Sequence, residues 1–227
     1  PWLYPKLPFD PVKSFEPVTL VAAVPNVLIV NNAFAEAHHI NSVHDLVVYA
    51  KAHPGELNFA SGGNGSAGHL AGALLNVRAG IDAVHVPYQG ASPAKLALLA
   101  GQANFMFDNL ASAAGLINES KVKALAVTTA QRSSIYPKLP TMEQEGIKDF
   151  DLGTWFGVFT TGGTPKAVVD KLNKAYVKAL EDPAVRKSLL VMGSDAKPTT
   201  SEAFAELVKH DLAKYKEIVK VSGAKIF

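Results

Sequence analysis

The chain has 227 residues, of which 48% are hydrophobic, enough to bury one large core or two modest ones. Its formal net charge is +2 and the charges are scattered, so no basic stripe indicates nucleic-acid binding. The absence of cysteine excludes disulfides and thiolate metal sites, and no stretch is long and apolar enough to span a bilayer as a helix.

The first predicted elements are an irregular arm and two apolar strands. Residues 1–17 contain five prolines and show no hydrophobic period, which predicts an extended arm on the surface. Strands are expected at Val18–Val24 and Asn26–Val30, with a kink between them at Pro25.

A helix is predicted next, beginning at Ser42, because Ser42 and Asp45 have the spacing of a capping pair. His38, His39 and His44 lie nearby, but their spacing matches no standard ligand set, so we interpret them as a solvated polar cluster. The buried face predicted for this helix consists of Val43, Leu46, Val47 and Ala50.

A run of small residues then follows a short apolar segment and precedes a helix whose predicted buried face is Leu70, Ala73, Leu74 and Val77. Glycine allows the close approach of a ligand to the backbone, and the first amides of a helix have no partner within it. An anion is favoured at such a helix start. The run therefore predicts half of a carboxylate-binding cleft, formed by Ser61, Gly62, Gly63, Asn64, Gly65 and Ser66.

Three other interpretations of this run stay open. Residues 63–68 have the form G-x-G-x-x-G, but a dinucleotide site also needs an acidic residue after the next strand, where Pro87-Tyr88-Gln89 stand. Ser66 as a hydrolase nucleophile would need a glycine two positions earlier, where Asn64 stands. The third interpretation is a tight turn that binds nothing.

Strands and helices alternate beyond this point, which predicts βαβ units and a parallel sheet. A strand at 83–88 precedes a helix with Ser92 as N-cap and Pro93 at its first position, and the inward side chains expected for that helix are Leu96, Leu99 and Ala100. A strand at 103–107, a short helix at 111–117 and a strand at 122–129 follow. Ligands bind at the carboxyl ends of such strands, here Ser61–Ser66, Tyr88–Ala91, Asp108–Asn109 and Thr128–Thr129.

The last third of the chain begins with a loop-like stretch in which Thr141 and Gln144 form a capping box around a short helix. A strand is expected at 152–160 and a helix from the turn at 162–165 to about Leu180. The buried face predicted for that helix is Val168, Leu172, Ala175 and Ala179. A helix ending at Gly193, a strand near 195–198 and a long amphipathic helix at 202–221 complete the chain.

Taken in order, segments spread over essentially all 227 residues resemble the Bug receptors, the extracytoplasmic solute-binding proteins of tripartite tricarboxylate transporters. These segments are LYPKLPFDP, TLVAAVPNVLIVN, LNFASGGNGSAGHLAG, HVPYQG, GQANFMFDN, KALAVTTAQRS and TWFGVFTTGGTP. The resemblance implies a periplasmic α/β protein of the two-lobed, type II binding-protein kind, with parallel-rich sheets flanked by helices. It also implies that the lobes close over a small organic carboxylate and deliver it to a membrane transporter, without catalysis, cofactor or metal.

The resemblance implies a second lobe at about 26–130 and a first lobe built from 1–25 and 131–227. Members of the family have a further N-terminal segment that supplies the first strands of lobe one, and the chain begins at Pro1 without an initiator Met or a signal peptide. We therefore expect a processed product or fragment with an incomplete first lobe, whose apolar faces are exposed or covered by self-association. The alternative function is a truncated, non-transporting member that acts as an oligomeric or interaction protein.

Roles for site residues follow by position once the resemblance is accepted. Amides and hydroxyls of the glycine-rich run hold one carboxylate, and His69 adds a donor or caps the helix. Asp108 orients a neighbouring amide, binds through water or receives an amino group of the ligand, and Trp155 closes over the ligand or fills core. The predicted ligand-binding set is Ser61, Gly62, Gly63, Asn64, Gly65, Ser66, His69, Tyr88, Gly90, Ala91, Asp108, Asn109, Thr154 and Trp155.

Overall fold

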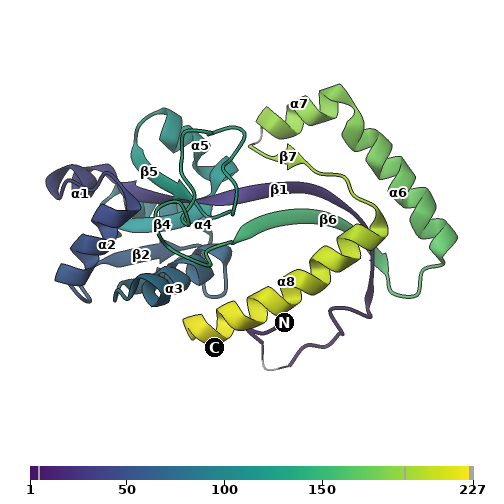
Figure 1. Cartoon of the computed structure of the whole chain (residues 1–227), viewed down its shortest axis with the longest axis horizontal. Helices are drawn as coiled ribbons and strands as arrows, with labels where there is room; N and C mark the ends of the chain where they lie inside the picture. Colours follow the sequence, from purple (N-terminus) through teal and green to yellow (C-terminus); the bar gives the residue numbers. More distant parts are fainter. Residues whose placement is uncertain (5, 192, 225–227) are drawn as a thin grey trace. The chain divides into compact units, whose positions relative to one another are not determined.

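The computed structural model describes residues 1–4, 6–191 and 193–224 (Figure 1). Its internal contacts divide the chain into unit one, Pro1–Val24 with Trp155–Glu217, and unit two, Pro25–Thr154 with Ile218–Phe227. The predicted lobe one also contains Pro5, Met192 and residues 225–227, which lie outside the described residues.

This division differs from the predicted lobes in residues 131–154, which belong to unit two. The reason is backbone pairing beside the end of strand β5 (Val122–Val127). The amide of Val127 donates to the carbonyl of Pro140 at 2.9 Å, and the amide of Leu152 donates to the carbonyl of Thr128 at 2.9 Å. Here Thr141 and Gln144 form the predicted capping box, with bonds of 3.1 and 3.2 Å, around a turn rather than a helix.

Unit two contains a mixed sheet with the strand order β3-β2-β4-β1-β5. Strands β2 (Asn58–Ser61), β3 (Val84–Pro87) and β4 (Phe105–Asn109) form its parallel part, since β2 pairs in parallel with both neighbours. Strand β1 (Phe15–Asn31) is antiparallel to β4 and β5. The sheet is therefore not uniformly parallel, because β1 enters it directly from unit one rather than through a crossover helix.

Five helices accompany this sheet within the described part of the unit: α1 (Asn32–Ala37), α2 (Val43–Ala52), α3 (Ala67–Ala79), α4 (Ala91–Leu99) and α5 (Leu110–Asn118). The core beneath them includes Leu28, Ile29, Leu46, Leu57, Phe59, Leu74, Leu75, Phe105, Phe107 and Phe150. Helix α3 lies very close to the sheet at Gly72, where an added Cβ would come 2.2 Å from the ring of Phe59. A side chain at this position would overlap the ring.

Strand β1 corrects the prediction of two strands kinked apart at Pro25, because it runs without interruption for 17 residues. Pro25 lies between the pair that Ala23 makes with Asp195 and the pair that Asn26 makes with Asn109. The strand changes partners at this point. Proline is tolerated in a strand where the ladder does not need its missing N–H.

The buried face predicted for α2 is confirmed in full, and the one predicted for α3 only in part. Helix α2 is confirmed, with Ser42 as N-cap and the four expected side chains buried. On α3, Leu70 and Leu74 are buried, but Ala73 is half-buried and Val77 is 48% exposed.

The prediction for α4 was wrong at its start and on its face. Gly90, at φ 108°, is the N-cap, so the helix begins one residue before Ser92. Ala94, Ala97 and Leu98 are buried, because small side chains let the helix approach the sheet, whereas the predicted inward residues Leu96, Leu99 and Ala100 are exposed.

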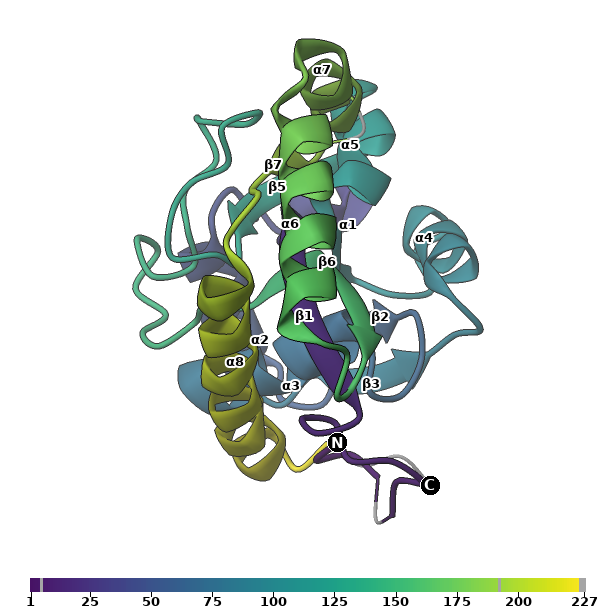
Figure 2. The ribbon, with the colours of Figure 1, turned by 90° about the vertical axis from the view of Figure 1, so that its right-hand side faces the viewer.

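Unit one is built on the first half of β1, which pairs with β6 (Gly153–Thr161) and β7 (Asp195–Ala196). Its helices are α6 (Lys166–Glu181), α7 (Pro183–Val191) and α8 (Ser201–Ser222) as far as Glu217, and Figure 2 shows α6 in front of β1 and β6. The ring of Phe204 is fully buried among the aromatic side chains of Trp155 and Phe159.

The buried face predicted for α6 was also wrong. Val169 and Leu180 are its buried residues, whereas Leu172 is half-buried and Val168, Ala175 and Ala179 are exposed. Apolar side chains on α6 and α7 reach solvent, as expected for the first lobe: Val168, Tyr176, Val185, Leu190 and Val191. Too few elements cover these helices in the described residues for an amphipathic pattern to be buried.

Candidate functional site

Four strand ends lie along one edge of the unit-two sheet. Strands β2, β3 and β4 are parallel neighbours, so their carboxyl ends meet at the same edge. Strand β5 runs in the same direction as β4, because both are antiparallel to β1. After β2, β3 and β4 the chain turns within a few residues into α3, α4 and α5 respectively. The positive ends of three helix dipoles therefore point towards this edge.

The glycine loop, residues 61–66, is braced from within. The hydroxyl of Ser61 donates to the carbonyl of Gly63 and accepts its amide, both at 3.1 Å. The amide of Gly65 donates to Nδ1 of His69 at 3.0 Å, and that of Ser66 to the carbonyl of Gly63 at 3.2 Å. Gly63 and Gly65 have φ values of 126° and 77°, which glycine adopts without strain. The amides of Gly63, Gly65 and Ser66 thus already have partners, contrary to the expectation that the whole run is free for a ligand.

Three amides of this segment stay available. The N–H groups of Gly62, Asn64 and Ala67 donate to no acceptor among residues 1–4, 6–191 and 193–224, and Asn64 is exposed. Ser66 caps α3, because its hydroxyl oxygen accepts the amide of His69 at 3.3 Å. A ligand at the loop would therefore meet the amides of Gly62, Asn64 and Ala67 rather than those of Gly63, Gly65 and Ser66.

The start of α4 is the open helix end at this edge. Asn109 caps α5 and Ser66 caps α3 with their side chains, whereas Gly90 provides no side-chain cap for α4. The backbone of α4 also lies against the glycine loop: a Cβ added to Gly62 would be 3.2 Å from the amide nitrogen of Ala91. The amide of Gly90 fixes this approach by donating to the carbonyl of Gly62 at 3.2 Å. Uncapped amides at a helix start favour an anion, and those of α4 lie beside Gly62.

Two histidines lie against the loop from its inner side. The ring of His69 is 8% exposed and stacks on the ring of His85, with centroids 3.9 Å apart and planes at 4°. Nε2 of His85 lies 2.6 Å from the hydroxyl oxygen of Ser61. Burial lowers the pKa of His69; burial and then the charge of His69 lower the pKa of His85 to about 4. Both rings are neutral at pH 7, and Nδ1 of His69 acts as an acceptor for the loop rather than as a donor to a ligand.

Asp108 takes one of its three expected roles, the orientation of a neighbouring amide. Its Oδ1 accepts the amide of Asn109 at 2.8 Å, and its Oδ2 lies 3.8 Å from Nζ of Lys95. Burial raises the pKa of Asp108, against the lowering effects of Ser112, Lys95 and the Asn109 amide. A buried carboxylate beside an ammonium group is a structural pair. The sequence did not reveal this pair, because Lys95 lies on α4 and Asp108 lies on β4.

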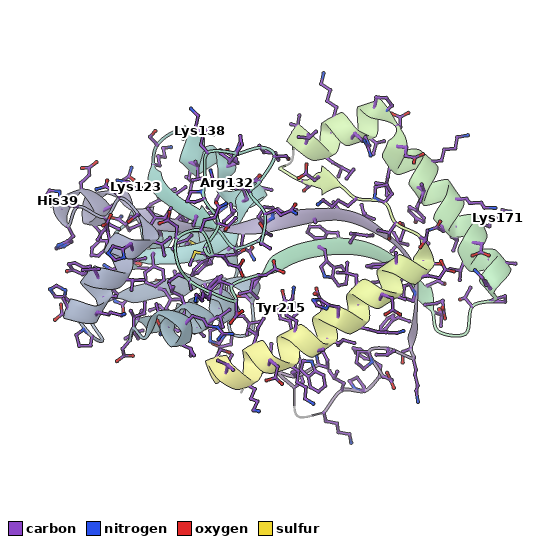
Figure 3. All side chains as sticks on the ribbon, viewed as in Figure 1. His39, Lys123, Arg132, Lys138, Lys171 and Tyr215 are labelled. Carbon is purple, nitrogen blue, oxygen red and sulfur yellow. The ribbon has the colours of Figure 1, made fainter. Side chains whose placement is uncertain are left out.

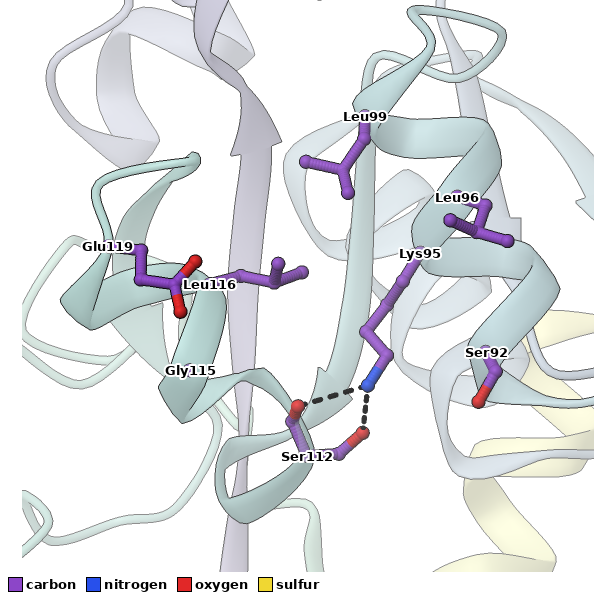
Figure 4. Close-up of a pocket in the computed structure, with 8 residues that line it drawn as sticks. All are labelled: Ser92, Lys95, Leu96, Leu99, Ser112, Gly115, Leu116 and Glu119. Carbon is purple, nitrogen blue, oxygen red and sulfur yellow. Dashed lines mark hydrogen bonds between the residues drawn. The ribbon is translucent and has the colours of Figure 1, made fainter.

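A pocket of about 400 Å³ lies between α4 and α5 (Figure 4). Nζ of Lys95 donates there to the carbonyl and the hydroxyl of Ser112, at 3.0 and 2.7 Å. The lining residues are Ser92, Lys95, Leu96, Leu99, Ser112, Gly115, Leu116 and Glu119. Leu96 and Leu99, which were predicted to be buried, form part of its α4 wall.

Two polar residues at this edge of the sheet, Asn26 and Thr128, are not in the predicted ligand-binding set. Asn26 is 2% exposed, and its Nδ2 has no hydrogen-bond partner in the described part of the chain. Its place within an otherwise apolar strand was the available signal. Thr128 is fully buried; its hydroxyl receives the amide of Asn26 at 3.2 Å and donates to the carbonyl of Leu152. Thr128 is a structural residue.

Thr154 and Trp155 stay predictions as ligand contacts. Trp155 donates from Nε1 to Asp211 at 2.6 Å, and its ring packs edge-on against Phe204 at 5.3 Å within unit one. These contacts favour the core-filling alternative for Trp155. The adjacent Thr154 belongs to unit two.

A metal centre and a membrane span find no support in the described residues. They contain no cluster of three or more His, Cys, Asp or Glu side chains placed to hold a metal ion. His39, one of the three histidines near α2, lies at the periphery of the α1–α2 region (Figure 3). None of the described helices combines the length and apolarity needed to cross a bilayer.

Comparison with known proteins identifies a family. The model of the tripartite tricarboxylate transporter family receptor matches residues 1–224. The chain is 36% identical over 219 residues to a Pseudomonas sp. (strain P51) protein described as a UPF0065 protein in the tcbD-tcbE intergenic region. That match covers 96% of the chain and 64% of the relative, so the chain spans less than two thirds of that protein's length.

Two solved structures have the same fold. The R. palustris protein Rpa4515 with adipate has a TM-score of 0.88 at 30% identity, covering 99% of this chain and 74% of the other. The periplasmic binding protein BugD has a TM-score of 0.84 at 34% identity, covering 98% and 74%. The expected α/β binding-protein fold is confirmed, and the chain covers 74% of each of these two solved chains.

Proposed function

The chain belongs to the tripartite tricarboxylate transporter receptor family, and we propose that it binds a small organic carboxylate and presents it to a membrane transporter of that type. We place this activity in the periplasm, in keeping with the similarity to BugD. Adipate in the similar R. palustris structure supports a dicarboxylate as the ligand class. The alternative of an oligomeric or interaction protein gains no support from the relatives.

The observation that carries this proposal is the uncapped start of α4 against Gly62. One carboxylate of the ligand would accept hydrogen bonds from the first amides of α4 and from the free amide of Asn64. Each charge-assisted hydrogen bond contributes about 1.5–3 kcal/mol, and the helix dipole adds about 0.3–1 kcal/mol. Recognition of this kind needs no arginine and depends on the backbone being held in place beforehand.

We propose no catalytic role for Ser66 or His69. The hydroxyl of Ser66 caps α3, and Nδ1 of His69 accepts the amide of Gly65, so neither atom forms a nucleophile–base pair with the other. The role we assign to the chain is reversible binding.

A thermal-shift and calorimetric screen tests the proposal. The probes are adipate and shorter dicarboxylates, a tricarboxylate, and the diamide of adipic acid as an uncharged control. A dicarboxylate at 100 times its Kd should stabilise the chain by about 2.7 kcal/mol, and the diamide should not. Absence of any response to the acids at millimolar concentration, from a chain that is folded by circular dichroism, would contradict carboxylate binding.

A further inference from the structure

We propose that His69 and His85 are positioning residues that hold the glycine loop in its binding shape, and that protonation of this ring pair releases the loop and weakens carboxylate binding in acidic solution. The part that concerns affinity rests on the proposed function. The part that concerns the loop stands on the ligand-free structure.

The two rings hold the loop at its two ends. His85 contacts Ser61, whose hydroxyl is bonded to both the carbonyl and the amide of Gly63. His69 receives the amide of Gly65. The two rings stack in parallel with their centroids 3.9 Å apart, and this contact connects the two ends of the loop. The loop conformation, with Asn64 on its exposed side, therefore depends on both histidines.

The hydrogen bond between Gly65 and His69 requires a neutral His69 ring. Because Nδ1 of His69 accepts from Gly65, its proton must be on Nε2. A second proton on Nδ1 would place two donors against each other and break this bond. Protonation of either ring also introduces charge into a stack in which the other ring lies within 4 Å. Protonation of both would set two like charges in direct contact.

Among the described residues, none supplies a counter-charge to the pair. Strand β2 contributes Phe59, whose ring stacks on His85 at 4.9 Å, and the hydroxyl of Ser61. Strand β3 and helix α3 contribute the two histidines themselves, and the loop contributes backbone groups. Burial is the first cause of the lowered pKa of both rings, and no carboxylate acts on either. The pair therefore becomes positively charged only when the pH falls below the ordinary pKa of histidine, about 6.5.

Matched variants separate titration from geometry. In His69→Asn the amide oxygen can replace Nδ1 as the acceptor for Gly65, and in His85→Gln the amide can replace Nε2 opposite Ser61. Neither of the two replacement side chains, asparagine or glutamine, titrates. His44→Gln is the control, because His44 is an exposed histidine outside the loop.

The first measurement is amide hydrogen exchange of Gly63 and Gly65 without ligand, from pH 7.5 to 3.5, corrected for the intrinsic pH dependence of exchange. We expect at least a tenfold loss of protection in the wild type and in His44→Gln, and a pH-independent protection in the double variant. Constant protection in the wild type, or the same loss in the double variant, would overturn the proposal. If the double variant does not fold, the wild-type imidazole signals decide: titration of both rings near the unperturbed pKa of about 6.5 would equally refute it.

The second measurement is the affinity for adipate over the same pH range. We expect it to fall at least tenfold on acidification in the wild type relative to the double variant, which corrects for the ionisation of adipate itself. A rise in the affinity of the wild type relative to the double variant would refute the affinity claim. It would mean that the imidazolium charge strengthens binding of the anion more than release of the loop weakens it. Failure of adipate to bind at any pH would count against the proposed function, while the ligand-free exchange would still decide whether the histidines hold the loop.

Discussion

Replacement of Gly62 by alanine should weaken carboxylate binding while leaving the chain folded. The added Cβ would lie 3.2 Å from the amide nitrogen of Ala91 and 3.3 Å from the carbonyl carbon of Gly90. Both are backbone atoms, so the start of α4 must move by a few tenths of an ångström. The backbone dihedral φ of Gly62 lies outside the left-handed region, so alanine adds crowding without conformational strain. The perturbation therefore acts on the proposed anion position itself.

The loss of one charge-assisted hydrogen bond, about 1.5–3 kcal/mol, corresponds to a decrease in affinity of about tenfold to a hundredfold. Overpacking should cost about 1 kcal/mol of unfolding free energy. Calorimetry with adipate measures the first quantity and urea unfolding the second. Gly115→Ala is the matched control, because no atom lies within 4 Å of its Cβ position in α5. Unchanged affinity in a folded Gly62→Ala variant would show that the ligand does not bind at the start of α4.

Three further predictions concern stability. Gly72→Ala should lower the unfolding free energy by about 2–3 kcal/mol in urea, since its Cβ would lie 2.2 Å from the ring of Phe59, and a loss below 0.5 kcal/mol would contradict this packing. Asn173→Ala should cost about 2 kcal/mol by the same assay, because its Nδ2 serves two backbone carbonyls at 2.8 Å each; an unchanged midpoint would mean that water replaces both bonds. The pKa of His85 is lowered to about 4, so the unfolded chain binds the proton first as pH falls below about 6.5, and stability decreases towards pH 4. After allowance for solvent screening we expect this site to lower the unfolding free energy by about 1–2 kcal/mol. The unfolding free energy of His85→Gln should therefore depend less on pH than that of the wild type, and identical pH profiles of the two proteins would refute this prediction.

Local signals in the sequence located the elements of unit two well. The start of α2 depends on Ser42 and Asp45, which lie within one turn of each other, and both its cap and its buried face were predicted. The order of strand, glycine loop and helix around residues 57–75 was predicted for the same reason, because glycine and serine act on their immediate neighbours. The family resemblance rested on such segments and is confirmed.

The errors lie where one element packs against another. The hydrophobic pattern of α4 favoured Leu96 and Leu99 as buried residues, whereas the sheet accepts Ala94 and Ala97. Periodicity identifies a helix but not which of two apolar faces fits the surface it meets. Lys95 and Asp108 show the same limit, since their contact depends on how α4 lies beside β4.

The sequence by itself determined that small residues at 61–66 would form a turn between a strand and a helix, because backbone freedom and capping are properties of adjacent residues. The tertiary structure alone decided what holds that turn. Parallel pairing sets Phe59 opposite His85 and so brings His85 beside Ser61, 24 residues earlier in the chain. It likewise sets the uncapped start of α4 against Gly62. Such contacts depend on strand register, which is fixed only when the whole sheet has assembled.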